Sequence, residues 1–276
     1  MSTQLDKIMH STFANSKRFF RIVTALQWLL AFLGTWVILS KSDNACVVLA
    51  VFIGSLAVVI IQQIGKLFYA RGERIRRAYM LREGLGISPS DSDLLDILSK
   101  EPAAVPREPQ PIQGYYSSSA PYGTSKFLHQ LHESAFWTSA LARFAAYVNY
   151  SIAGVGLLLT MGAALLLLHT GNSGSTSPDY ARLFANLLLF FLAGSTLSAG
   201  SGYWALSNES GRVADQASNL RQDETPDMVA TLRLVARYDI ALAKCLPLPT
   251  YAYKILQAKL HASWKEVCGK SGRSSY

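Results

Sequence analysis

Charged residues are scarce in this chain, and their scarcity argues against the commonest class of protein. Of the 276 residues, 16% are Asp, Glu, Lys or Arg, whereas 50% are hydrophobic. Because soluble domains usually carry about 25% charged residues, we do not expect a water-soluble globular protein. Cysteine is also rare: Cys46, Cys245 and Cys268 show no CxxC spacing. Neither a disulfide framework nor a zinc site is therefore indicated.

Four long uncharged runs account for much of the hydrophobic content. They cover 22–40, 44–65, 144–168 and 183–208. A hydrocarbon core of about 30 Å needs roughly 20 apolar helical residues, and each run approaches or exceeds that length. Burial in a soluble core would explain one such run but not four, and the first run is longer than the core of a typical signal peptide. We predict an all-α polytopic membrane protein with two transmembrane helical hairpins.

The positions of Lys and Arg predict the orientation of these hairpins. The two loops on one side hold only Lys41 and Arg182. Lys and Arg accumulate on the cytoplasmic side of membrane helices, so we expect both termini inside the cell. The net charge of +8 then indicates contact with anionic lipid rather than with a nucleic acid polymer. On the cytoplasmic side lie Lys7, Lys17, Arg18, Arg21, Lys66, Arg71, Arg74, Arg76, Arg77, Arg82, Lys126, Arg143, Arg212 and Arg221.

This orientation divides the chain into five parts. The outer loops are too short for folded domains, so most of the non-membrane chain is cytoplasmic. The central cytoplasmic part contains a short expected helix at 91–98 and a Pro-rich linker at 102–111. The parts are a cytoplasmic N-terminal segment (1–21), a first transmembrane hairpin (22–65), cytoplasmic helices with the linker (66–143), a second transmembrane hairpin (144–208) and cytoplasmic C-terminal helices (209–276).

Helix signals continue directly from the membrane runs into the cytoplasmic parts. The segment 66–83 contains no helix breaker, so we expect the second spanning helix to continue until Gly84 and Gly86 end it. Thr124 or Ser125 is a candidate N-cap for a helix that runs into the third span. The stretch after the fourth run also lacks proline. We therefore expect long helices that cross the membrane and extend into the cytoplasm.

Two amphipathic helices are expected near the C-terminus. Thr225 as N-cap and Pro226 at the first position predict the start of one of them, and Gly269 is placed to end the other. Basic amphipathic helices beside a membrane lie on its surface or pack on each other, and the narrow apolar stripes favour packing. The expected apolar faces are Met228, Leu232, Val235, Leu242 and Leu246 in the first helix, and Tyr253, Leu256, Leu260, Trp264 and Val267 in the second.

No arrangement typical of a catalytic centre or a cofactor site is present. The sequence contains neither a P-loop nor GxGxxG, and neither Cys245 nor Cys268 has an adjacent base. His129, His132 and Glu133 share one helical face, but their order matches neither HExxH nor HxxEH. A packing role is the expected one, with metal binding as the alternative. We predict a protein that is not an enzyme and has no cofactor.

The fourth run carries the candidate packing or assembly residues. Gly194, Ser198 and Gly202 are spaced at i, i+4 and i+8, a small-xxx-small pattern that lets helix backbones approach closely. The pattern fits packing against the third run, packing between protomers, or the lining of a polar conduit. Asn149 and Asn186 also lie within runs, and amides in lipid normally turn toward a partner helix or water.

Several stretches resemble a bacterial family. They are 76–86 (RRAYMLREGLG), 115–118 (YYSS), 131–138 (LHESAFWT), 246–249 (LPLP) and Trp264. Together with the two hairpins, they make most of the chain similar to the SMODS-associating four-transmembrane effectors, which are encoded beside cyclic-oligonucleotide synthases in antiphage systems. The resemblance implies a pore-forming or membrane-disrupting effector, triggered through its cytoplasmic part by a cyclic oligonucleotide or a protein. It implies no active-site residues.

Two other functions remain open from the residues alone. A non-conducting membrane scaffold that anchors a cytoplasmic interaction module would need the same hairpins. A small transporter is less favoured, because no charged residue within the runs marks a coupling site. A pore that forms by association of protomers would make the protein a homo-oligomer.

Overall fold

The computed structural model describes residues 2–39, 45–88, 90, 116, 118, 120–170, 195–223 and 225–271. Within these ranges the regular structure is entirely helical, which confirms the expected all-α class. The expected helix at 91–98 and the linker at 102–111 lie outside the described residues. The helices are α1 (Ser2–Leu39), α2 (Ala45–Leu85), α4 (Thr124–Thr170), α6 (Ser195–Leu220), α7 (Met228–Ala243) and α8 (Thr250–Ser271).

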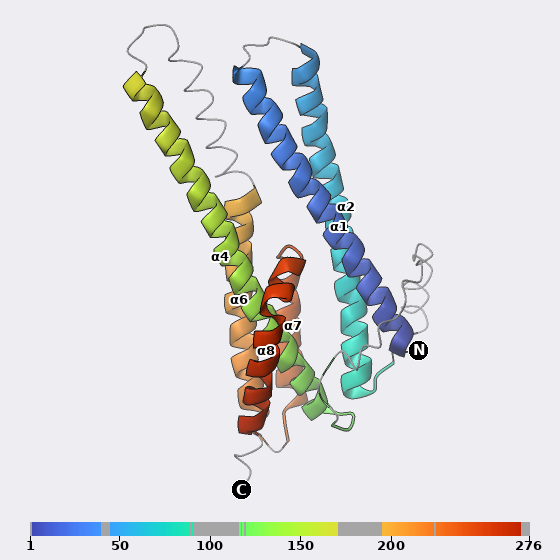
Figure 1. Cartoon of the computed structure of the whole chain (residues 1–276). Helices are drawn as coiled ribbons and strands as arrows, with labels where there is room; N and C mark the ends of the chain where they lie inside the picture. The colour runs from blue at the N-terminus through green and yellow to red at the C-terminus, as the bar shows by residue number, and fades with distance from the viewer. Residues whose placement is uncertain are drawn as a thin grey trace.

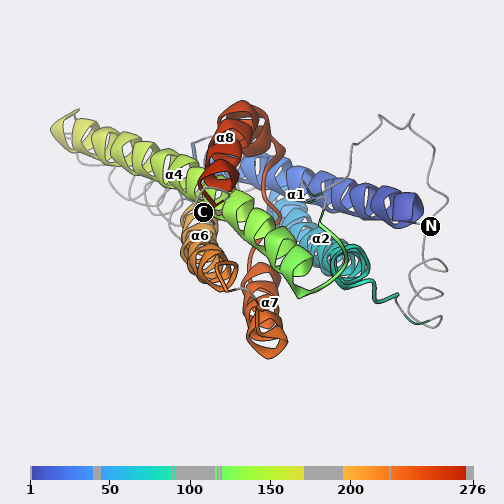
Figure 2. The same ribbon diagram turned by 90° about the horizontal axis from the view of Figure 1, so that it is seen from below.

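The helices form two long pairs with a shorter helical layer around one end (Figure 1). Helices α1 and α2 lie side by side, and α4 and α6 form the second pair. Helices α7 and α8 flank the lower part of α4 on different sides, as the view from below shows (Figure 2). Both ends of the chain lie toward this lower end (Figure 1).

Two helical stretches are long and apolar enough to cross a membrane. They are Leu49–Leu85 in α2 and Thr124–Gly162 in α4, and only 11% and 29% of their most apolar windows are buried. Such low burial is unusual for the core helix of a soluble protein. The first expected span falls in α1, which is not one of these two stretches, and most of the fourth lies outside the described residues. Membrane-spanning helices are thus supported at the second and third runs.

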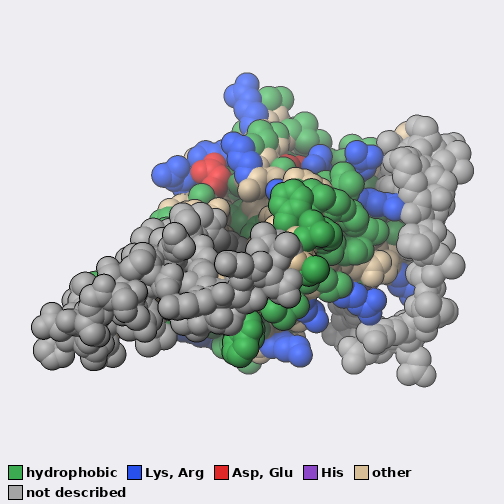
Figure 3. All heavy atoms as spheres, turned by 90° about the horizontal axis from the view of Figure 1, so that it is seen from above, with side chains coloured by type: hydrophobic (Ala, Val, Ile, Leu, Met, Phe, Trp, Pro, Cys, Tyr) green, Lys and Arg blue, Asp and Glu red, His purple; other side chains and the backbone are tan. Residues whose placement is uncertain are grey.

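Large apolar side chains cover the upper halves of these helices. Phe32 of α1, Phe52 of α2 and Leu158 of α4 are 65%, 68% and 64% exposed, respectively. From above, hydrophobic side chains gather over the α1–α2 pair, with Lys and Arg side chains toward the edges of the molecule (Figure 3). Exposed apolar patches of this extent mark contact with a membrane or with a partner protein.

Glycine ends α2 where the sequence predicted it. Gly86 has φ of 74°, a left-handed conformation that favours glycine. Its N–H donates to the Arg82 carbonyl at 3.0 Å, and the N–H of Ile87 donates to the Leu81 carbonyl at 3.3 Å. The first of these bonds, from a glycine with positive φ to the carbonyl four residues earlier, is the αL motif that commonly ends a helix. The prediction that the second spanning helix continues to this point is therefore confirmed.

A second glycine brings α2 against the start of α4. A Cβ on Gly84 would lie 2.7 Å from Phe127 Cδ2 and 2.9 Å from Phe127 Cα. The backbone N–H of Gly123 donates to the Gly84 carbonyl at 2.8 Å. Thr124 is the first helical residue of α4 and not the residue before it, so the helix begins slightly earlier than the expected cap at Thr124 or Ser125 implied. Only glycine allows this approach, because any side chain at position 84 would overlap the backbone of α4.

The starts and faces of α7 and α8 differ in part from expectation. Asp227, rather than Thr225, caps α7, because its carboxylate accepts from the N–H groups of Val229 at 3.0 Å and Ala230 at 3.2 Å. Helix α8 also runs through Gly269 to Ser271. The buried face of α7 is Thr231, Leu234, Tyr238 and Leu242, so the expected face was rotated. The expected Leu260 and Trp264 of α8 are buried, together with Ala252.

The main core lies where α2, α4, α6 and α7 meet. Phe127, Leu128 and Leu131 of α4 are completely buried in it. This core fixes the lower halves of the long helices against one another, whereas their upper halves carry the exposed apolar side chains. Its other buried members are Met80, Ala135, Ala142, Leu206, Val213, Ala214, Ala217, Leu234, Tyr238 and Leu242.

Candidate functional site

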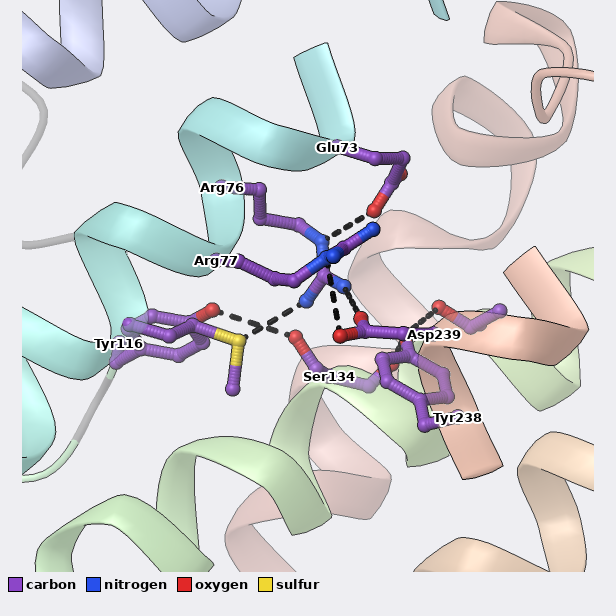
Figure 4. Close-up of polar contacts among 9 residues, drawn as sticks. Glu73, Arg76, Arg77, Tyr116, Ser134, Tyr238 and Asp239 are labelled. Carbon is purple, nitrogen blue, oxygen red and sulfur yellow. Dashed lines mark hydrogen bonds and ion pairs between the residues drawn. The ribbon is translucent and has the colours of Figure 1, made fainter. Parts of the chain in front are cut away.

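A buried arginine joins α2 to α7 within this core (Figure 4). The side chain of Arg76 is only 6% exposed. Its Nε donates to Glu73 Oε2 at 2.7 Å, and its Nη2 donates to Asp239 Oδ1 at 3.0 Å. The neighbouring Arg77 forms an ion pair with the other oxygen of Asp239, with its Nε 3.0 Å from Oδ2. Two guanidinium groups and two carboxylates therefore balance their charges at this junction.

Tyr238 of α7 connects this group of charged residues to α4. The Arg76 guanidinium carbon lies 5.2 Å from the centre of the Tyr238 ring, a cation–π distance. The Tyr238 hydroxyl lies 2.7 Å from Thr138 Oγ1 and donates to the Ser134 carbonyl at 3.1 Å. Tyr116 contributes a weaker contact to Ser134 Oγ at 3.4 Å. Figure 4 shows these groups converging from three helices.

The junction positions helices rather than reactive groups. Buried charges are tolerated only when they are paired and hydrogen-bonded, and the guanidinium of Arg76 has a partner at each nitrogen, the third being Met80 Sδ at 2.9 Å. A fully paired arginine is not poised to transfer a proton or to attack a substrate. Its effect is to fix α2, α4 and α7 in one relative arrangement.

Sequence reasoning missed this site. Arg76 was counted with the basic residues expected near lipid headgroups, yet it points into the core. Asp239 is the only acid in α7, and a lone carboxylate in an otherwise apolar and basic helix signals a buried cationic partner. The identity of that partner, 163 residues earlier in the chain, was not readable from local patterns.

The two expected histidines pack against an indole. His129 and His132 lie 5.6 and 5.0 Å from the Trp264 ring, both edge-on. Burial and the positive charge of Arg221 lower the pKa of each to about 4, and Arg221 Nη1 lies 3.1 Å from His132 Nδ1. Among the described residues no group of three His, Cys, Asp or Glu side chains is placed to hold a metal ion.

The two cysteines near the C-terminus, Cys245 and Cys268, are not activated. Burial raises the pKa of Cys245 to about 12. Cys268 Sγ lies 3.9 Å from His129 Nε2, a proximity that the sequence did not indicate, but burial raises the pKa of this thiol as well. A neutral thiol beside a neutral imidazole lacks the thiolate that nucleophilic catalysis requires.

Three of the predicted packing or assembly residues lie within the described part of the chain. Ser198 is exposed, and a Cβ on Gly202 would meet no atom within 4 Å. Gly200 is instead the residue that approaches α4, because its Cβ would lie 3.0 Å from the Tyr150 ring. Asn149 donates to the Ala145 carbonyl of its own helix at 2.8 Å. Gly194 and Asn186 lie outside the described residues.

No protein-family model, curated protein or solved structure matches this chain. The informative features are the exposed apolar halves of α1, α2 and α4 and the paired arginine that joins α2, α4 and α7.

Proposed function

We propose that this protein is a pore-forming or membrane-disrupting effector of a bacterial defence system. Four helices span the inner membrane as two hairpins, both termini are cytoplasmic, and several protomers associate. A signal that reaches the cytoplasmic helices, either a cyclic oligonucleotide or a protein, opens or disrupts the membrane. The nature of the signal and the link to defence come from the family resemblance.

The continuity of α2 and α4 is the observation that carries this proposal. Each helix runs without a break from an upper half with exposed apolar residues to a lower half packed in the core. The junction around Arg76 and Tyr238 clamps the two lower halves together through α7. Packed helices move as rigid bodies, so a change at α7 would be transmitted directly to both spanning helices.

The open face of α6 supports assembly between protomers. If the small-xxx-small residues of α6 packed within one protomer, α4 would cover Gly202. Instead Gly200 contacts α4, and a Cβ on Gly202 would meet no atom within 4 Å. Small residues at an open face permit close approach of a second helix in a membrane. Ser198 and Gly202, the described residues of the small-xxx-small pattern, are therefore available for contact with another protomer.

Catalysis is not part of the proposal. His129 and His132 are neutral and packed on Trp264, and Cys245 is a protonated, buried thiol. We expect His132→Ala and Cys245→Ala to retain biological activity within a few-fold of wild type, provided that the variants insert and fold.

A non-conducting scaffold is the second candidate, and one surface favours it. Val229, Leu232 and Ile240 of α7 are 55%, 43% and 57% exposed, and their spacing places them along one side of the helix. Because α7 lies in the cytoplasmic part of the proposed topology, lipid would not cover this side. A protein partner bound there would fit a membrane-anchored interaction module.

Membrane potential distinguishes the two functions. The full chain is expressed in bacteria together with its neighbouring genes, and a voltage-sensitive dye reports the potential. At a given abundance in the membrane, a pore-forming effector depolarises the cells, whereas a scaffold leaves the potential unchanged. An unchanged potential under all these conditions would favour the scaffold.

A further inference from the structure

One basic side chain of α1 reaches the start of α8 beside the first membrane run, and a second lies next to it on α1. Arg21 of α1 immediately precedes the first apolar residue of that run, and its Nη2 lies 3.5 Å from the Thr250 hydroxyl. Lys17 lies one turn earlier on the same face of α1. Segments 229 residues apart in sequence thus come together at a position with two cations and a hydroxyl group.

These two cations lack the carboxylate partners that four of the arginines have. Arg76, Arg77, Arg212 and Arg237 each pair with Asp or Glu. Within the described part of the chain, no carboxylate pairs with Lys17 or Arg21. Lys17 is half-buried, and burial together with the charge of Arg21 lowers its pKa. An anion bound between the two would relieve this repulsion.

The surrounding residues place the pair at the cytoplasmic boundary of the proposed membrane part. Ser16 donates to the carbonyl of Gly65 at 3.0 Å, and Gly65 is the last residue of the second run. Tyr251 contacts Phe144, the first residue of the third run, with ring centres 6.4 Å apart. Tyr251 is itself 40% exposed, and exposed tyrosines are enriched at the level of lipid headgroups.

We propose that Lys17 and Arg21, with the Thr250 hydroxyl, bind the phosphate of an anionic phospholipid in the cytoplasmic leaflet. Such a lipid would connect the α1–α2 pair to α8, which packs on α4. The bound headgroup would therefore help to set the relative position of the two hairpins at the membrane surface. This inference rests on the proposed membrane topology but not on pore formation.

Lipid retention tests the site. The full chain is purified in a mild detergent with phosphatidylglycerol or phosphatidylcholine, and native mass spectrometry counts the lipids bound per protomer. The test variant is Lys17→Gln/Arg21→Gln. The matched control is Arg18→Gln/Lys66→Gln, which removes the same charge from exposed residues at the same boundary. Thermal unfolding verifies that both variants are folded.

We expect wild type and control to retain phosphatidylglycerol in preference to phosphatidylcholine. The test variant should retain roughly tenfold less phosphatidylglycerol, since each basic residue at a membrane surface contributes measurably to anionic lipid binding. If both variants lost the same amount of bound phosphatidylglycerol, general surface charge would explain the binding, and the proposed site would be wrong. If millimolar inorganic phosphate displaced the lipid as effectively as phosphatidylglycerol itself, the site would belong to a soluble phosphate compound instead. The result of this measurement does not depend on whether the protein forms a pore.

Discussion

Arg76 Nη2 and Asp239 Oδ1 lie 3.0 Å apart, which joins α2, the helix that contains the second apolar run, to α7 near the C-terminus. The pair is buried at the point where α2, α4 and α7 meet. This ion pair therefore links the α1–α2 pair of helices to the part of the chain that follows α6. A displacement of α7 must therefore either move α2 as well or break this ion pair.

The first prediction tests this pair. Arg76→Gln leaves Glu73 and Asp239 without their buried cationic partner, and such losses cost about 3–5 kcal/mol. Arg77→Gln removes an arginine that is 47% exposed, and exposed ion pairs contribute about 0–1 kcal/mol. Thermal unfolding in detergent should show a large loss of stability only for Arg76→Gln. Equal midpoints for the two variants would mean that the buried pair does not hold the helices together.

The second prediction concerns the contact between α2 and α4. Gly84→Ala places a Cβ against the Phe127 backbone, and overpacking of this kind costs about 1–3 kcal/mol. Gly34→Ala on α1 is the matched control, because a Cβ there meets nothing within 4 Å. Hydrogen exchange at the start of α4 should increase in Gly84→Ala and not in the control. Unchanged exchange in both variants would contradict the close approach.

The third prediction is a pH dependence of stability. His129 and His132 have folded-state pKa values of about 4, below the ordinary value of about 6.5. The unfolded chain therefore binds more protons between these values, and stability is lost as the pH falls from about 6.5 toward 4. His132→Gln should therefore reduce the slope of stability against pH. A slope unaffected by His132→Gln would place the pH dependence elsewhere.

The fourth prediction concerns topology and uses the asymmetry of Lys and Arg. Reporter fusions at Gln113 and after Tyr276 should report the cytoplasm, and a fusion at Asn172 should report the periplasm. The physical reason is that basic loops resist translocation. A periplasmic signal at Gln113 would rule out the proposed two-hairpin arrangement.

Local signals in the sequence predicted the helices well. The end of α2 at Gly86 follows from the left-handed conformation that glycine adopts at low cost, and the long course of α4 follows from an uninterrupted apolar run. The cap of α7 was misplaced because Thr225 and Asp227 are both good N-cap residues. Only the geometry reveals that the Asp227 carboxylate reaches the free N–H groups.

Contacts between distant segments were beyond local patterns. The face of α7 was misassigned because Thr231 and Tyr238 are polar, yet both are buried with hydrogen-bond partners. Arg76 was interpreted as a solvated residue because no residue near it in the sequence indicates that Asp239 will pair with it. Likewise, spacing identified Gly202 as a packing residue but could not indicate that Gly200, two positions earlier, takes the contact with α4.

The most direct test of the account compares two leucine substitutions in cells. Gly202→Leu fills the open face of α6, and Gly34→Leu fills an equally open position on α1. Leucine favours membrane insertion, so both variants should reach the membrane at wild-type abundance. A voltage-sensitive dye then reports depolarisation in cells that express each protein with its neighbouring genes. We predict that wild type and Gly34→Leu depolarise the cells and that Gly202→Leu does not, because a bulky side chain holds neighbouring protomers apart. Equal depolarisation by all three proteins would contradict assembly through this face, and an unchanged potential with wild type would contradict the pore itself.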